Sequence, residues 1–155
     1  MKLCFALLAL AIATVAAAPN EQKEIQTLYA RGLAGDQEAV NRCLEKLETV
    51  VQAEPSNQLA RVYLGSAYTL RSRDLGFGPA KLRALRHGLA LMDEAVAAAP
   101  NEPKVRLARA RTTAALPAIF GRRAETENDF KILRELARRE PQKFEPADLP
   151  ALLSH

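Results

Sequence analysis

Apolar residues recur every three or four positions along much of the chain, the spacing expected of helices that bury one face. One run keeps this spacing over four turns and places five side chains on one face: Leu82, Leu85, Leu89, Met92 and Val96. The same period recurs in segments 40–51 and 59–70, and more weakly in 130–137. No segment shows the period-two alternation typical of a strand. The pattern therefore predicts an all-α protein whose helices pack against one another.

Prolines separate these amphipathic segments at nearly equal intervals. Pro55, Pro100 and Pro141 each follow a helical run and precede a new element, at spacings of 45 and 41 residues. Proline ends a helix because it lacks an N–H and disfavours the α conformation in the residue before it. Residues that suit a helix start, as side-chain caps or as a first-turn proline, follow these breaks: Ser56, Asn57, Asn101 and Pro103. The regular spacing predicts a repeated antiparallel helix pair.

The order of small and bulky residues in the central pair resembles the tetratricopeptide repeat. In that repeat the first helix carries Leu-Gly and then Tyr, and the second carries a small, a bulky and a small residue before a closing proline. The matching residues are Leu64, Gly65, Tyr68, Gly88, Met92, Ala95 and Pro100. Small residues let the two helices approach closely, and bulky ones fill the space between neighbouring pairs. The resemblance implies a short α-solenoid of about three stacked antiparallel helix pairs.

Weaker matches lie on both sides of the central pair. On the N-terminal side, Gly32, Cys43 and Pro55 stand at positions of the repeat, with Cys43 in place of a small residue. On the C-terminal side the match spans 103–141, but Asp129 stands where a small residue is expected. The resemblance thus covers most of the chain beyond residue 18, and Asp129 is a clear departure from it.

Two insertions separate this chain from the 34-residue unit of the tetratricopeptide repeat. About 11 extra residues lie near 71–82 and about 7 near 117–123, each between the two helices of a pair. Both insertions combine Gly and Pro with an aromatic residue, Phe77 in the first and Phe120 in the second. These phenylalanines either anchor longer turns onto the core or form a paired ligand contact on one rim of the stack.

The first 18 residues have the features of an export signal. Lys2 supplies a positive start, the residues up to Val15 are almost wholly apolar, and small residues follow. Cleavage after Ala17 competes with cleavage after Ala18, because a proline would directly follow the second site. The sequence therefore predicts a signal peptide over residues 1–18.

A membrane anchor is the weaker alternative for this segment. An anchor needs about 20 apolar residues, whereas the run here ends after about 16 and a polar stretch follows. We therefore expect a helical repeat domain over residues 19–155 that is periplasmic or secreted after cleavage. Cys4 lies too close to the start of the chain to serve as a lipid-attachment site.

Loss of the leader would leave Cys43 as the one cysteine, so no internal disulfide is expected even in an oxidising compartment. Cys43 lies within the apolar stripe of segment 40–51, which predicts a small buried hydrophobic residue. A reactive or intermolecular thiol is the alternative.

Composition supports one globular domain and offers little catalytic chemistry. The 155 residues are 48% hydrophobic and 26% charged, with two histidines, His87 and His155. No cysteine pair or histidine spacing suggests a metal site. The segment Gly76-Phe77-Gly78 lacks the strand and the Lys-Ser/Thr of a phosphate-binding loop. We therefore expect no cofactor, no metal and no enzymatic activity, and interpret the protein as a binding module.

Charge placement suggests where a partner could bind. Between Glu102 and Glu125 the chain has no acidic residue but six basic ones: Lys104, Arg106, Arg109, Arg111, Arg122 and Arg123. If the first helix of each pair lines a concave side, Arg106 and Arg109 share a face that can meet an anionic partner, and Arg111 points elsewhere. The alternative is a set of solvated arginines balanced by the nearby acidic residues Glu125, Glu127 and Asp129.

A second basic patch lies N-terminal to the first. It contains five basic residues with a single acidic neighbour, Asp74: Arg71, Arg73, Lys81, Arg83 and Arg86. The formal net charge of the whole chain is nevertheless only +4, and no nucleic-acid-reading element is recognisable. We therefore expect no nucleic-acid partner.

The leading hypothesis is an exported module that binds or assembles with a protein or peptide, with unknown oligomeric state. Its candidate contacts are the residues of the Arg-rich stretch and of the two insertions: Arg106, Arg109, Arg122, Arg123, Phe77 and Phe120. The alternative is peripheral contact of the Arg-rich face with anionic phospholipid or acidic glycan.

A carboxylate clamp of the kind found in some tetratricopeptide domains is poorly matched, because Lys104 fits one position but Ala108 replaces its arginine partner. Segment 144–153 is expected to cover the last pair's apolar face, with a docking tail as the alternative.

Overall fold

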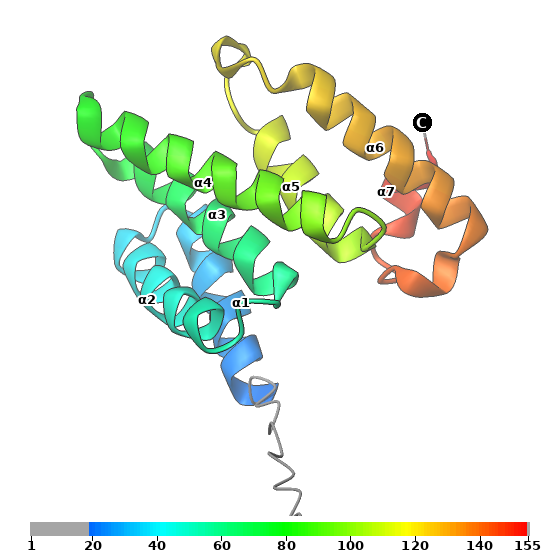
Figure 1. The fold of residues 1–155 in the computed structure, drawn as a ribbon, viewed down its shortest axis with the longest axis horizontal. Coiled ribbons are helices and arrows are strands. Elements are labelled where there is room, and N and C mark those ends of the chain that lie inside the picture. Colours follow the sequence, from blue (N-terminus) through cyan, green and yellow to red (C-terminus); the bar gives the residue numbers. More distant parts are fainter. Residues whose placement is uncertain (1–18, 155) are drawn as a thin grey trace, which may run out of the picture.

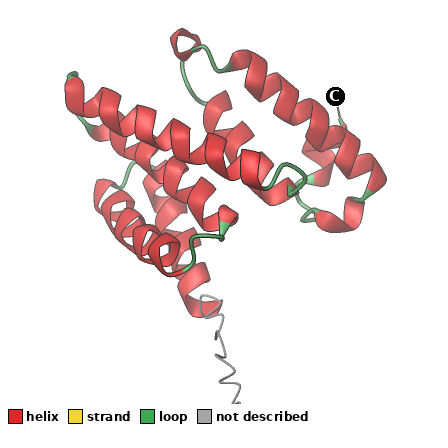
Figure 2. Cartoon of the chain, in the orientation of Figure 1, coloured by secondary structure: helices red, strands yellow, loops and turns green. Residues whose placement is uncertain are grey.

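The computed structural model describes residues 19–154, which form helices joined by turns, without strands (Figures 1 and 2). Six longer helices follow one another along the chain: α1 (Pro19–Leu33), α2 (Gln37–Ala53), α3 (Gln58–Asp74), α4 (Pro79–Ala98), α5 (Pro103–Ala114) and α6 (Arg123–Arg139). Three short elements complete them: the 3-10 turns η1 (Ala118–Phe120) and η2 (Pro141–Lys143), and helix α7 (Leu149–Leu153). The expected all-α class is confirmed for the described residues. The expected signal peptide, residues 1–18, lies outside them.

Side-chain caps and prolines set where several helices begin. The Asp36 carboxylate accepts a hydrogen bond from the Ala39 N–H at 2.9 Å at the start of α2. The Asn57 side-chain oxygen accepts one from the Ala60 N–H at 3.0 Å at the start of α3. Such caps satisfy N–H groups that have no partner within the helix. Pro103 occupies the first turn of α5 as the sequence predicts, and Asn57 is the one of the three candidate caps that acts as such.

The helices pack in two rows. Each of the six longer helices contacts the next along the chain, and in addition α1 contacts α3 and α3 contacts α5. The helices α1, α3 and α5 therefore form one row, with α2, α4 and α6 placed against it (Figure 1). Three clusters of buried apolar residues fill the spaces between the rows, the first shared by α1–α3, the second by α3–α5 and the third by α5, α6 and the C-terminal segment.

Helices α3 and α4 approach each other most closely at two glycines. A Cβ atom added to Gly65 would lie 2.5 Å from the Gly88 carbonyl oxygen, and one added to Gly88 would lie 2.5 Å from the Gly65 carbonyl oxygen. Gly65 also faces Met92 whereas Gly88 faces Thr69, so the two helices run antiparallel. The backbones touch directly here, and only a residue without a Cβ fits at either position.

The other residues that match the tetratricopeptide pattern lie around this contact, with one exception. Leu64, Met92 and Ala95 are buried. Tyr68 is half-buried, donates a hydrogen bond from its hydroxyl to Glu48 at 2.5 Å, and has a pKa raised to about 12 by burial and by that carboxylate. Pro100 is exposed in the turn after α4. It ends the helix but does not pack between helices.

The first insertion is not an extended loop. The extra residues of 71–82 lengthen α3 to Asp74 and start α4 at Pro79, so only residues 75–78 form the turn. As a result the α3–α4 hairpin projects beyond its neighbours, at the left of Figure 1. The second insertion does form a loop between α5 and α6, which contains η1.

The C-terminal segment covers an apolar face of α5 and α6, in line with the expectation for residues 144–153. Phe144 and Leu152 are buried against Leu107, Leu133 and neighbouring residues of α5 and α6. The segment thereby removes apolar surface of these two helices from water. Cys43 is likewise buried, 1% exposed, and burial raises the pKa of its thiol to about 11. The thiol is therefore protonated near neutral pH, as expected of a structural residue.

Substitution of Gly65 by Ala tests the contact between α3 and α4. The added methyl group would meet backbone atoms that cannot move away separately from their helix, so we expect Gly65→Ala to lower the free energy of unfolding by about 1–3 kcal/mol. This expected fall is the net change, after the gain in helix propensity of about 1 kcal/mol has been taken into account. Urea denaturation followed by circular dichroism measures the change.

The matched control is Gly76→Ala, because a Cβ atom at Gly76 meets nothing within 4 Å. We expect it to change the free energy of unfolding by less than about 0.5 kcal/mol. Equal stability of the Gly65→Ala variant and the unmodified protein would contradict the close approach.

Candidate functional site

An open groove of about 1030 Å³ runs along the row formed by α1, α3 and α5. Its wall continues into the start of the α5–α6 loop and into the C-terminal segment. Helix α3 lies at its centre, because α3 contacts both α1 and α5. Most of the groove is therefore built from α1, α3 and α5, with smaller contributions from α2 and α4.

The middle of the groove is apolar and carries two tyrosines. The rings of Tyr29 and Tyr63 pack edge to face, with centroids 5.5 Å apart and an interplanar angle of 72°. Burial raises the pKa of Tyr63, so its hydroxyl stays neutral at physiological pH. Leu70 and Leu107 supply apolar surface beside them. Such a lining can hold aliphatic or aromatic side chains and offer hydroxyl groups to a polar backbone.

The C-terminal segment closes one end of the groove with two ion pairs. Lys104 Nζ lies 2.8 Å from Glu145 Oε1, and Arg111 Nη2 lies 2.6 Å from Asp148 Oδ1. The hydrogen bond to Glu145 raises the pKa of Lys104. All four residues line the groove. This end of the groove therefore presents paired charges of both signs.

The opposite end of the groove is cationic and aromatic. Arg73 donates hydrogen bonds to the carbonyl oxygens of Gly32 at 2.8 Å and Leu33 at 3.4 Å, which close the end of α1. Lys81 lines the groove nearby, and its Nζ lies 3.5 Å from the Leu75 carbonyl oxygen. Phe120, half-buried in η1, lines the groove as well.

The two phenylalanines of the insertions have different environments. Phe120 lies against the groove, whereas Phe77 is fully exposed in the turn between α3 and α4. Phe77 therefore does not anchor its turn onto the core. The two rings do not form an equivalent pair, although both lie on loops that join the two helices of a pair.

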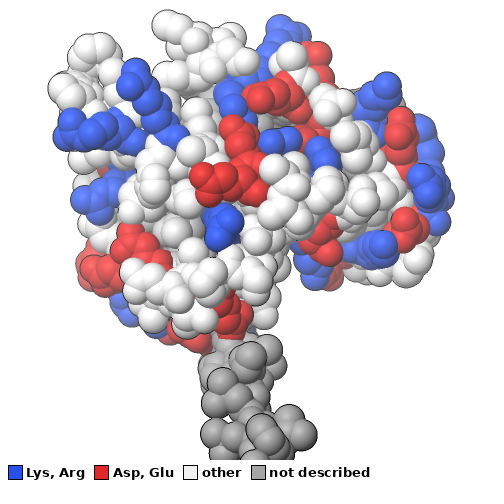
Figure 3. Space-filling view, in the orientation of Figure 1, with Lys and Arg blue, Asp and Glu red and all other residues white. Residues whose placement is uncertain are grey.

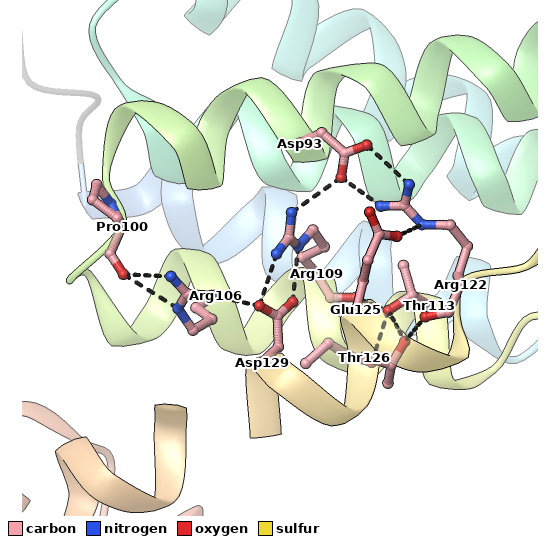
Figure 4. Close-up of polar contacts among 10 residues, drawn as sticks. Asp93, Pro100, Arg106, Arg109, Thr113, Arg122, Glu125, Thr126 and Asp129 are labelled. Atoms are coloured by element: carbon pink, nitrogen blue, oxygen red, sulfur yellow. Dashed lines mark hydrogen bonds and ion pairs between the residues drawn. The ribbon is translucent and has the colours of Figure 1, made fainter. Parts of the chain in front are cut away.

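Arg106 and Arg109 share one helix face, as expected, but this face packs on α6 (Figure 4). The Asp129 carboxylate is fully buried and accepts hydrogen bonds from Arg106 Nη1 at 2.5 Å, Arg109 Nε at 2.8 Å and Arg109 Nη2 at 2.7 Å. Arg106 Nη2 also donates to the Pro100 carbonyl oxygen at 2.7 Å. The expectation of a free cationic face at Arg106 and Arg109 is therefore corrected, because both guanidinium groups are neutralised inside the protein.

A second carboxylate extends this network to α4. Asp93 lies 3.1 Å from Arg109 Nη1 and also accepts hydrogen bonds from both terminal nitrogens of Arg122. Arg122 Nε lies 2.7 Å from Glu125 Oε2 (Figure 4). The carboxylates of Asp93 and Asp129 thus join α4, α5 and α6 through arginines of α5 and of the loop before α6. Burial lowers the pKa of Arg109, but the two carboxylates outweigh it and the net shift is upward.

Arg123 is the exposed member of the four candidate arginines, and its side chain is 84% exposed. Its Nε lies 3.0 Å from Glu127 one turn along α6, an arrangement worth at most about 0.5 kcal/mol. The arginine of α5 that lines the groove is Arg111, which was expected to point away from the partner-binding face. Lys104 and Arg111 lie two turns apart on α5, so they share the face opposite to the Arg106–Arg109 face.

Sequence reasoning missed Tyr29, Tyr63 and Arg111 as groove residues. Tyr63 belongs to the periodic stripe of segment 59–70, which was interpreted as core. The helical spacing of Lys104, Ala108 and Arg111 was available as a signal for a shared face. Nothing in the sequence alone shows which face of α5 is turned toward the groove.

Within residues 19–154, no cluster of three or more His, Cys, Asp or Glu residues has the arrangement of a metal site. Over the same residues, no helix combines the length and hydropathy needed to cross a bilayer. His87 is exposed, and its ring packs edge to face on Tyr68 with centroids 4.6 Å apart. The groove, of about 1030 Å³, is therefore the hollow from which we argue a function.

Removal of the Asp129 carboxylate tests the buried network. In Asp129→Ala, Arg106 would remain buried without its main counter-charge, so we expect the free energy of unfolding to fall by about 3–5 kcal/mol. Glu127→Ala on the same helix is the matched control, because its ion pair with Arg123 is exposed and its loss costs at most about 0.5 kcal/mol. Urea denaturation measures both variants, and equal losses would contradict a central role for Asp129.

Comparisons with known proteins do not assign this chain to a family. No family model matches it, and neither a curated protein nor a solved structure is significantly similar to it. The functional argument therefore depends on the groove, on the residues that line it and on the chemistry they can offer.

Proposed function

We propose that the protein is a non-catalytic binding module whose groove along α1, α3 and α5 holds an extended segment of a protein partner. In this proposal the helix pairs α1–α2, α3–α4 and α5–α6 form a short solenoid of the tetratricopeptide kind. The observation that carries it is the groove itself, whose lining comes mainly from α1, α3 and α5. Concave surfaces of stacked helix pairs are typically used to bind peptides or protein segments.

The size of the groove favours a peptide over a small molecule. Its volume of about 1030 Å³ lies at the upper limit of small-ligand pockets, about 300–1,000 Å³, and it is open along its length. An extended chain has side chains on alternate sides and unpaired backbone groups, so it needs both apolar surface and hydrogen-bonding groups. The leucines and the tyrosine hydroxyls of the groove supply these two kinds of contact.

The charges at the two ends favour a defined orientation of the bound segment. Arg73 and Lys81 at one end suit an acidic residue, whereas the paired charges at the other end balance one another. Electrostatic complementarity of this kind sets orientation and specificity more than affinity. We further propose that the signal peptide directs the protein out of the cytoplasm, so that its partner is another exported or envelope protein.

A variant that fills the groove tests this proposal. Peptides are selected by phage display against the chain without residues 1–18, and their Kd values are measured by fluorescence anisotropy. Ala115 lines the groove and Ala114 does not, although both residues are exposed at the end of α5. We expect Ala115→Trp to raise Kd at least about tenfold by occupying space needed by the peptide.

Ala114→Trp is the matched control and should change Kd by less than about twofold. Equal affinity of both variants and the unmodified protein, or failure to select any peptide, would contradict binding in the groove.

A further inference from the structure

The tip of the α3–α4 hairpin carries exposed features that the groove does not explain. Both helices run to this tip, and only residues 75–78 join them. The hairpin projects beyond the other helices at the left of Figure 1. We define the hairpin tip as residues 71–86, which include the end of α3, the turn and the start of α4.

The hairpin tip is strongly cationic. Its basic side chains are Arg71, Arg73, Lys81, Arg83 and Arg86. Figure 3 shows Lys and Arg side chains gathered over this end of the hairpin, at the upper left. The one acidic residue of the tip is Asp74, whose side chain is only 16% exposed and lies 3.3 Å from Arg73 Nε. Among the described residues, Arg71, Lys81, Arg83 and Arg86 have no carboxylate within ion-pair distance. Their charges are therefore available to an anionic partner.

The same tip exposes apolar side chains. Phe77 is fully exposed at the apex of the turn, and Leu82 is 43% exposed on the first turns of α4. In the neighbouring α5–α6 loop, Ile119 is 88% exposed. Lys81 of the tip and Pro117 of that loop line the same groove, so the two loops border one end of it. An exposed aromatic ring surrounded by cations is the combination that binds the interface of an anionic membrane.

We propose that the hairpin tip docks the protein on an anionic lipid surface, with Phe77 entering the headgroup region and the surrounding Lys and Arg side chains contacting lipid phosphates. Arg73 and Lys81 of the tip line the groove, but Phe77, Arg83 and Arg86 do not. A membrane contact through these three residues would leave the groove open to a partner. It also relocates the anionic contact that the sequence placed on segment 104–123, because Arg106, Arg109 and Arg122 are paired inside the protein.

A lipid surface fits the tip better than an acidic protein does. A projecting turn gives Phe77 no pocket of its own, so a protein partner would have to supply a matching cavity. A bilayer interface accepts a projecting ring without such a cavity. Basic residues on both helices of the hairpin can then contact headgroups around the inserted ring.

Tryptophan fluorescence can detect the insertion directly. The chain contains no Trp, so Phe77→Trp introduces a single reporter at the apex of the tip. The chain without residues 1–18 is used, because residues 25–152 contain all three buried clusters. With vesicles of phosphatidylglycerol and phosphatidylcholine we expect a blue shift that is absent with phosphatidylcholine alone and weakens at high salt. Leu153→Trp, on α7, is the control and should show no shift.

Charge removal tests the cationic part of the proposal. The double variant Arg83→Gln/Arg86→Gln should bind anionic vesicles at least about tenfold more weakly, since each cation near such a surface contributes about fivefold. Arg138→Gln/Arg139→Gln removes the same charge from exposed positions at the end of α6 and should weaken binding by less than about twofold.

Three results would overturn the proposal. They are the absence of a blue shift at residue 77, equal weakening by the two double variants, and charge-dependent binding of the tip to polyglutamate without binding to vesicles. The last result would assign the tip to an acidic protein instead. Because peptide affinity is measured separately, failure here leaves the proposed groove function testable.

Discussion

The direct backbone contact between α3 and α4 at Gly65 and Gly88 is the constraint on which the rest of the structure depends. Because both residues lack a Cβ, the two helices pack closely enough for α3 to become the central element of the fold. Helix α3 then contacts α1 and α2 on one side and α5 on the other. The groove exists because these contacts hold α1, α3 and α5 in one row.

The second constraint is the division of the arginines between the interior and the surface. Successive residues of a helix are rotated by about 100°, so neighbouring arginines on α5 point in different directions. Arg106 and Arg109 turn toward Asp129 and hold α6, whereas Arg111 turns toward the groove. Removing one partner of a buried ion pair costs far more than removing an exposed one, so this network specifies how α6 sits on α5.

The local spacing of apolar residues predicted the helical class and the burial of Cys43. The close approach of α3 and α4 at Gly65 and Gly88 was implied by the resemblance to the tetratricopeptide repeat. The sequence did not predict the direction of the α5 faces. Helical geometry gives the angle between Arg106 and Arg111, but only packing against α6 decides which of them is buried. The same limit applies to Phe77, since Gly and Pro nearby indicate a turn but not how far α3 and α4 extend toward it. Asp129 was recognised as a departure, and its physical reason is the pair of arginines that it neutralises.

Native-state hydrogen exchange of the chain without residues 1–18 tests the central role of the α3–α4 contact most directly. Amides in the core of a cooperative structure exchange only through global unfolding, whereas peripheral helices exchange through local opening. We predict that the slowest amides lie in α3 and α4 around Gly65 and Gly88, and that those of α1 and α7 exchange faster. Exchange of the α3 amides as fast as those of α7 would contradict the account.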